Sequence, residues 1–192
     1  TIVPDPTQGK NPEVMRAANQ TTVVNIRKPN AAGLSHNQYR DLQVGKDGAI
    51  FNNSSEIVKT QLAGYITGNK QLAGHQSANL ILNEVTGNMP SSLNGYLEIA
   101  GQKASLVLAN PNGIVGNNFG FINTSRAVLT TGIPHLDSSG QLNDFFVSQG
   151  EVRLEGAGLN ARDTDYTDIY AKAVKLNAGL WAKNLSVITG KN

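Results

Sequence analysis

Four Val residues recur at nearly regular intervals along the second half of the chain. Val107 is followed by Val128 after 21 residues, by Val152 after a further 24 and by Val174 after another 22. A repeat of this length is typical of a solenoid, in which successive coils made of short strands and turns stack on each other. The period therefore predicts a coiled all-β architecture.

The text around the last two of these positions repeats as well. Residues 174–182 read like residues 152–161 with one residue deleted, and in both a charged residue stands between two aliphatic ones, as a strand with one buried face requires. We predict a parallel β-helix whose interior stacks the four Val residues, with Asn side chains at the corners hydrogen-bonding between coils. The alternative is a β-sandwich, whose strands recur about every 8–12 residues. The sandwich fold does not require its amino-acid sequence to repeat, so the repeat favours the β-helix.

Composition supports an all-β chain. The sequence holds 22 Asn and 20 Gly, and only 16% of its residues are charged. Asn and Gly tolerate the backbone of tight turns, so their excess predicts many turns between short segments. The expected strands are residues 21–26, 49–51, 79–82, 96–100, 104–108, 127–130, 145–148, 152–154, 174–176 and 185–189.

The two ends of the chain differ from its middle. Residues 1–20 hold three of the seven Pro, and we expect an irregular lead-in that starts a cap, with a turn or two of helix at 12–18. Residues 21–192 are expected to form one β-helical domain. The chain starts without Met or an apolar leader and stops just after a strand-like run, so we expect it to be the front of a longer protein whose leader is absent.

Several functional classes are excluded by residue content. The chain has no Cys, which rules out disulfides, thiol catalysis and Cys-based zinc sites. Its 16 basic and 14 acidic residues are spread along the sequence and give a net charge of +2, which argues against a nucleic-acid-binding face. No apolar run approaches the roughly 18–20 residues that cross a bilayer. We therefore expect neither a nucleic-acid partner nor direct membrane insertion by this fragment.

The sharpest local motif is Asn110-Pro111-Asn112-Gly113-Ile114. Pro111 fixes φ at the second position of a turn, Asn112 and Gly113 accept turn conformations, and the Asn110 side chain can close an Asx turn. The motif predicts a corner between two strands. A rigid turn of this kind can also be recognised and bound by a partner protein.

Candidate catalytic and metal-binding residues are few. Asp163, Asp165 and Asp168 fall within six residues, but the Gly and Glu that an EF-hand needs are missing, so we expect a solvated loop. The three His residues are widely spaced and match no metal-ligand pattern; we expect them at the surface or in local hydrogen bonds. No nucleophile motif or phosphate-binding Gly loop is present. We predict no catalytic residue, no metal and no cofactor.

Five stretches of the sequence together match one known family: 24–26, 29–39, 81–87, 109–114 and 120–126. In this order they resemble the N-terminal secretion domain of two-partner-secretion exoproteins. This family includes filamentous haemagglutinin, secreted haemolysins and contact-dependent growth inhibition toxins, and the similarity runs from about residue 21 to the end.

The resemblance implies a fold and a role. The fold is a right-handed parallel β-helix with an N-terminal cap and short extra-helical β elements. The role is that of a secretion signal and folding nucleus, without catalysis, in an exoprotein that passes through the periplasm to the cell surface. Its partner would be an outer-membrane transporter whose periplasmic POTRA domains bind it, and we expect the fragment to be a monomer. A self-sufficient adhesin or haemolytic domain, or a β-helical enzyme acting on polysaccharides, is the alternative.

The resemblance also implies two Asn-Pro turn motifs that serve transporter recognition or folding. The second is intact as Asn110 to Ile114, whereas at the first this sequence reads Asn69-Lys70-Gln71-Leu72 and keeps only the outer Asn and Leu. Many relatives carry a Cys pair where this chain has residues 116–119, Gly-Asn-Asn-Phe. That pair cannot be essential here.

Overall fold

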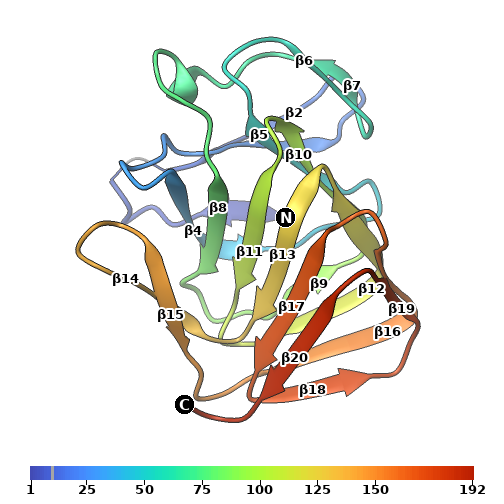
Figure 1. The fold of residues 1–192 in the computed structure, drawn as a ribbon. Helices are drawn as coiled ribbons and strands as arrows, with labels where there is room; N and C mark the ends of the chain where they lie inside the picture. The colour runs from blue at the N-terminus through green and yellow to red at the C-terminus, as the bar shows by residue number, and fades with distance from the viewer. Residues whose placement is uncertain (10) are drawn as a thin grey trace.

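The computed structural model describes residues 1–9 and 11–192 and shows a solenoid of parallel strands (Figure 1). In the described part of the chain, two long sheets enclose one core, and the chain alternates between them as it winds from coil to coil. The strands of one coil pair in parallel with those of the next, for example Leu106 with Ile81 before it and with Ala127 after it. The parallel β-helix predicted from the period is therefore confirmed.

The first sheet follows the order β1-β4-β8-β11-β13-β17-β20, with only β1 antiparallel to its neighbour. Its strands are β1 (Ile2–Pro4), β4 (Leu34–Leu42), β8 (Leu80–Val85), β11 (Ala104–Ala109), β13 (Thr124–Thr130), β17 (Tyr166–Ala171) and β20 (Leu185–Thr189).

The second sheet follows the order β18-β16-β12-β10-β5-β3-β2, with β19 beside β16 and β9 beside β12. Its strands are β2 (Glu13–Arg16), β3 (Thr22–Asn25), β5 (Ala49–Asn53), β9 (Ser91–Leu93), β10 (Leu97–Gly101), β12 (Ile114–Ile122), β16 (Glu151–Ala161), β18 (Ala173–Leu176) and β19 (Leu180–Ala182). The long strands β12 and β16 bend across a corner, because their two halves pair with different short strands.

Two hairpins lie outside the coils. One is β6 (Val58–Thr60) with β7 (Gly64–Ile66), and the other is β14 (Ile133–Leu136) with β15 (Leu142–Phe146). A short 3-10 helix, η1 (Lys70–Leu72), follows the first hairpin. The described residues contain no helix that is long and apolar enough to cross a membrane.

The repeated text marks two stacked coils. Val152 pairs with Val174 at the start of the repeat, and Leu159 pairs with Leu180 further along, so the offset drops from 22 to 21 residues where one residue is deleted. The alignment made from the sequence is confirmed by this register.

The prediction of one interior column of four Val residues is wrong. Val107 and Val128 do pair with each other, but they belong to a separate cluster on the outer face of the first sheet, where Leu142 and Phe145 of the β14–β15 hairpin cover them. Leu106 and Leu108, on either side of Val107, face the main core instead. Such a sheet is apolar on both faces, so alternation along the strand cannot identify the inner one.

The N-terminal residues close one end of the solenoid. Strand β1 pairs antiparallel with β4, and β2 pairs antiparallel with β3, which places Ile2 in the main core. The turn of helix expected at 12–18 is wrong, because Glu13–Arg16 form strand β2. Tertiary pairing with β3 overrides the weak helical preference of this short segment.

Asn side chains hydrogen-bond between coils from positions within the strands, in addition to the corners where the sequence predicted such bonds. Asn37 and Asn83 occupy equivalent positions in β4 and β8, and both are buried. Asn83 Nδ2 donates to the carbonyl of Val107 in the next coil at 3.2 Å, and the Tyr39 hydroxyl donates to Asn83 Oδ1 at 2.7 Å. Asn52 Nδ2 likewise donates to Asn25 Oδ1 of the preceding coil at 3.1 Å.

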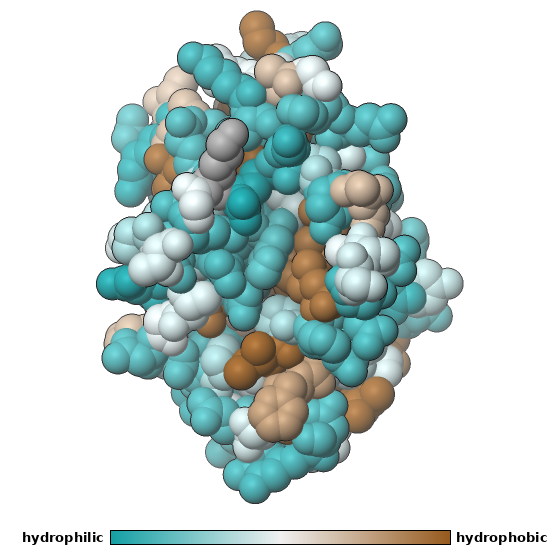
Figure 2. Space-filling model, turned by 90° about the vertical axis from the view of Figure 1, so that its left-hand side faces the viewer, coloured by the Kyte–Doolittle hydropathy of each residue, from teal (hydrophilic) through white to brown (hydrophobic). Residues whose placement is uncertain are grey.

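The side of the molecule seen in Figure 2 is mostly hydrophilic, and hydrophobic atoms gather in its lower half. Figure 1 places the β14–β15 hairpin on this side, and the hairpin carries the exposed residues Ile133 and Phe146. Exposed apolar side chains thus lie both on this hairpin and on the last coil, where Leu185 and Ile188 of β20 are exposed.

Candidate functional site

The turn at Asn110 joins β11 to β12. The Asn110 carbonyl accepts from the Gly113 amide at 3.1 Å, and Asn110 Oδ1 accepts from the Asn112 amide at 2.9 Å, which makes the β-turn and Asx turn expected from the motif. Gly113 has φ 115°, a backbone that side chains with a Cβ rarely adopt. Ile114 follows at once as a fully buried core residue.

This turn lies between a preceding and a following coil. Asn110 Nδ2 donates to the Met89 carbonyl and to Ser91 Oγ, both at 2.9 Å, and Asn112 Nδ2 donates to the Gly87 carbonyl at 2.8 Å. On the other side, the side-chain Nε2 of Gln149 donates to the Pro111 carbonyl at 3.0 Å. Asn110 is only 1% exposed, so its side chain joins coils and is covered by them.

The first motif forms the same local structure. Asn69 Oδ1 accepts from the Gln71 amide at 3.0 Å, and the Asn69 carbonyl accepts from the Leu72 amide at 3.1 Å. Asn69 Nδ2 donates to the carbonyls of Ile26 at 2.9 Å and Asn52 at 3.0 Å. Both Asn69 and Leu72 have no exposed surface.

The two motifs are therefore equivalent although the first lacks Pro. In both, one Asn accepts from the amide two residues later, and its Nδ2 donates to two groups of neighbouring segments. The third residue of each turn supplies a further amide group: Gln71 Nε2 donates to the Asn25 carbonyl at 3.0 Å, much as Asn112 reaches Gly87. Sequence reasoning missed Gln71, whose only signal is its place two residues after the Asn.

The resemblance places a Cys pair of many relatives at residues 116–119. In this chain, Phe119 packs into the core at that place. Phe119 is 1% exposed, and its ring meets that of Phe121 edge-on at 6.0 Å. A Cβ on Gly116 would stand 2.2 Å from the Phe119 ring, so Gly is required there. An apolar contact thus fills this part of the core without any thiol.

The acidic run departs in part from the expected solvated loop. Asp163 and Asp165 are exposed, but Asp168 is buried in β17 and paired with Arg126 of the neighbouring β13. The guanidinium of Arg126 also lies 4.4 Å from the ring centre of Tyr166. Asp168 lies two residues after Tyr166, the register partner of Arg126, so the Arg126 side chain of the preceding coil reaches it along the strand, which explains the difference. Among the described residues, no group of three or more His, Asp or Glu is arranged to hold a metal.

The His residues lie at three separate places. His36 Nε2 is 2.8 Å from Glu84 Oε1, and His135 Nδ1 is 3.1 Å from Asp144 Oδ1, so both take part in local pairs as expected. His75 is exposed and follows the first Asn turn.

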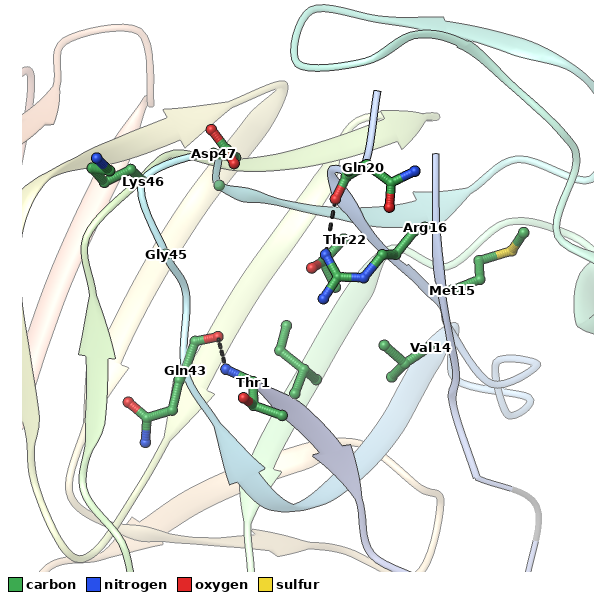
Figure 3. Close-up of a pocket in the computed structure, with 12 residues that line it drawn as sticks. Thr1, Val14, Met15, Arg16, Gln20, Thr22, Gln43, Gly45, Lys46 and Asp47 are labelled. Atoms are coloured by element: carbon green, nitrogen blue, oxygen red, sulfur yellow. Dashed lines mark hydrogen bonds between the residues drawn. The ribbon is translucent and has the colours of Figure 1, made fainter. Parts of the chain in front are cut away.

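A hollow of about 310 Å³ opens beside the N-terminal cap (Figure 3). Arg16 Nη1 donates to the Gln20 carbonyl at 2.9 Å, so the Arg16 side chain stabilises the turn between β2 and β3. Lys46 and Asp47 lie on the opposite side and point away from Arg16 (Figure 3). The hollow therefore brings together no acid–base pair.

Known proteins resemble this chain over nearly its whole length. The family model described as the TPS secretion domain matches residues 1–192. The chain is 46% identical over 183 residues to Toxin CdiA of Yersinia pestis, and 48% identical over 187 residues to 16S rRNA endonuclease CdiA of Enterobacter cloacae. These matches cover 95% and 97% of this chain but only 6% of each relative.

Among solved structures, the filamentous hemagglutinin secretion domain is similar to this chain with a TM-score of 0.88. The two are 36% identical, and the match covers 100% of this chain and 64% of the other. The family and the fold are those of a secretion domain, which works with a partner transporter in the outer membrane. The chain therefore belongs to the TPS secretion domains, the modules by which exoproteins of the CdiA and filamentous haemagglutinin kind are secreted through the periplasm to the cell surface.

Proposed function

We propose that this chain is bound by the periplasmic POTRA domains of its partner transporter and then starts the folding of a longer exoprotein outside the cell. It acts as a monomeric binding module without catalysis of its own. The nuclease activity in the names of some relatives belongs to those proteins, of which this chain matches only 6%. Residues 21–192 form the β-helical unit, and residues 1–20 start its cap.

The Asn turns serve this function mainly through folding. What supports this is their burial: Asn69 and Asn110 expose 0% and 1% of their surface, so a partner cannot touch either amide in the folded domain. Each amide hydrogen-bonds to the coils around it, which adds stability only when those coils are in place. A turn that closes after its neighbours have stacked favours the orderly growth of a solenoid.

The two ends of the solenoid support a nucleating role. At one end, β1 and β2 cap the first coil by antiparallel pairing. At the other, β18 and β20 stand at the sheet edges, and β20 exposes Leu185 at 45% and Ile188 at 60%. A following coil of a longer exoprotein would cover these side chains, as each described coil covers the one before it.

One experiment tests the proposed function. The chain, joined to a secretory leader, is produced with its partner transporter and with a transporter lacking the POTRA domains. We expect folded, protease-resistant chain in the medium only with the intact transporter. Equal release with both would contradict the proposal. Calorimetric titration of the chain with the purified POTRA domains, and with those of an unrelated transporter as a control, measures the binding directly.

A further inference from the structure

Basic side chains converge in a hollow beside the first Asn turn. The hollow has a volume of about 600 Å³ and is lined by Arg27, Lys28, Lys70, Gln71 and His75 together with an Ala. No carboxylate stands among these lining residues. For a chain with a net charge of only +2, this is a marked local concentration of positive charge.

The convergence depends on the buried Asn69. Its Nδ2 donates to the Ile26 carbonyl, which joins the segment that continues into Arg27 and Lys28 to the turn that continues into Lys70. Arg27 and Lys28 stand 42 or more residues before Lys70 in the sequence, so no local sequence pattern indicates that they lie together. The tertiary hydrogen bond places them on the two walls of one hollow.

These cations are available to a partner. Lys28 and Lys70 are exposed, and none of the ion pairs between described residues includes Arg27, Lys28 or Lys70. Arg27 is held in place because its Nη1 donates to the His36 carbonyl at 3.1 Å. Partial burial lowers the pKa of Arg27, but an arginine in a protein stays protonated.

We infer that Arg27, Lys28 and Lys70 form a docking surface for an acidic segment of the transporter's periplasmic domains. This inference rests on the proposed function and adds the surface and the charge of the partner segment. An acidic protein segment fits this surface, because the hollow of about 600 Å³ has room for several side chains and is lined by basic residues without a carboxylate. His75 offers an additional hydrogen-bonding group in the same hollow, whereas the side-chain amide of Gln71 donates to the Asn25 carbonyl.

The arrangement gives the first Asn turn a second consequence. Asn69 touches no partner, yet it fixes the distance between the two groups of bases, so it is a positioning residue for this surface. At the second Asn turn the equivalent position after Asn110 is Pro111, which carries no charge. The two turns share a structure, whereas the basic surface belongs to the first alone.

The test compares two double variants with equal change in charge. In the cluster variant, Lys28→Glu and Lys70→Glu reverse the exposed bases of the hollow. In the control variant, Lys103→Glu and Lys175→Glu reverse two exposed Lys residues elsewhere on the solenoid. Because all four side chains are exposed, both variants should keep the circular dichroism spectrum and the melting temperature of the parent chain.

Binding to the purified periplasmic domains is measured by calorimetry in about 0.05 M and about 0.5 M salt. We expect the cluster variant to lose at least about tenfold in affinity at low salt and the control variant to lose less than about threefold. High salt should weaken the binding of the parent chain much more than the binding of the cluster variant. Salt screens the attraction between opposite charges, and the cluster variant has already lost this attraction.

The outcomes separate the two proposals. If the parent chain does not bind the periplasmic domains, the proposed function fails and the inference fails with it. If the parent chain binds and the cluster variant binds equally well, or both variants lose the same affinity, the inference is wrong and the function stands. The inference would also be overturned if the cluster variant bound the periplasmic domains as the parent chain does but no longer bound vesicles containing anionic lipid. The basic residues would then bind a membrane surface instead.

Discussion

Replacing Asn110 by Ala tests whether the buried turn amide holds neighbouring coils together. The side chain makes two hydrogen bonds as a donor, to the Met89 carbonyl and Ser91 Oγ, and two as an acceptor, from the backbone and side-chain amides of Asn112. Ala keeps the backbone of the turn but removes all four bonds. The loss therefore falls on contacts between coils as well as within the turn.

The magnitude follows from how deeply each bond is buried. The bond to Ser91 is fully buried, so the hydroxyl left without this partner costs about 1–3 kcal/mol. The bonds to Met89 and to the Asn112 backbone are partly buried, and each costs about 0.5–1.5 kcal/mol because water can replace it. The fourth bond adds little, because the side-chain amide of Asn112 keeps its other bond to the Gly87 carbonyl. Asn110→Ala should thus lower the free energy of unfolding by about 2–6 kcal/mol in total.

Urea unfolding followed by circular dichroism measures this free energy. Asn112→Ala is the matched control, because Asn112 lies in the same turn, is partly exposed and donates mainly to the Gly87 carbonyl; it should cost about 1 kcal/mol. A cost for Asn110→Ala no larger than that of the control would refute the claim that the buried amide joins the coils. An unchanged slope of the denaturant dependence would show that both variants unfold as the parent chain does.

Three further changes test other parts of the structure. Lys70→Pro should raise the free energy of unfolding by about 0.4–1 kcal/mol in urea melts, because Asn69 has φ −83° and ψ 110°, the extended backbone that precedes Pro; a loss of stability would contradict this. Val152→Asp should bury a charge in the main core and cost several kcal/mol, so an unchanged melting temperature would show that Val152 does not face the core. The hydrogen bonds from Thr7 hold the pKa of Asp5 below its ordinary 3.8, so the stability that Asp5 contributes is present above that pH and is lost as the pH falls through the lowered value. Asp5→Asn should therefore melt below the parent chain at about pH 6 and approach it at low pH, and a difference that does not vary with pH would be the contrary result.

The period and the repeated text predicted the β-helix because each coil must meet its neighbour at fixed register. They did not predict which side of the strand faces the core. In Leu106-Val107-Leu108 both faces are apolar, since the β14–β15 hairpin covers the outer one. This hairpin is inserted in the sequence between β13 and β16 and is not part of the repeat, so the repeat does not predict it.

Polar strands were missed for a related reason. Strand β4 reads Leu-Ser-His-Asn-Gln-Tyr-Arg-Asp-Leu, in which Ser35 and Asn37 are buried through hydrogen bonds to backbone and side-chain groups of the coil. A hydrophobic pattern cannot identify such a strand, because its buried polar groups are satisfied only by tertiary partners. The Asn110 turn was predictable because Pro, Asn and Gly specify it locally, whereas the basic hollow beside Asn69 depends on segments far apart in sequence.

The most direct test of the account is calorimetric binding of Asn112→Ala and Asn110→Ala to the transporter's periplasmic domains, run beside thermal melts of the same samples. If the turns act through folding, both variants should melt at lower temperature, and at a temperature where they are folded they should bind within about threefold of the parent chain. Lost affinity together with an unchanged melting temperature would contradict this and make the turn itself the feature that the transporter reads.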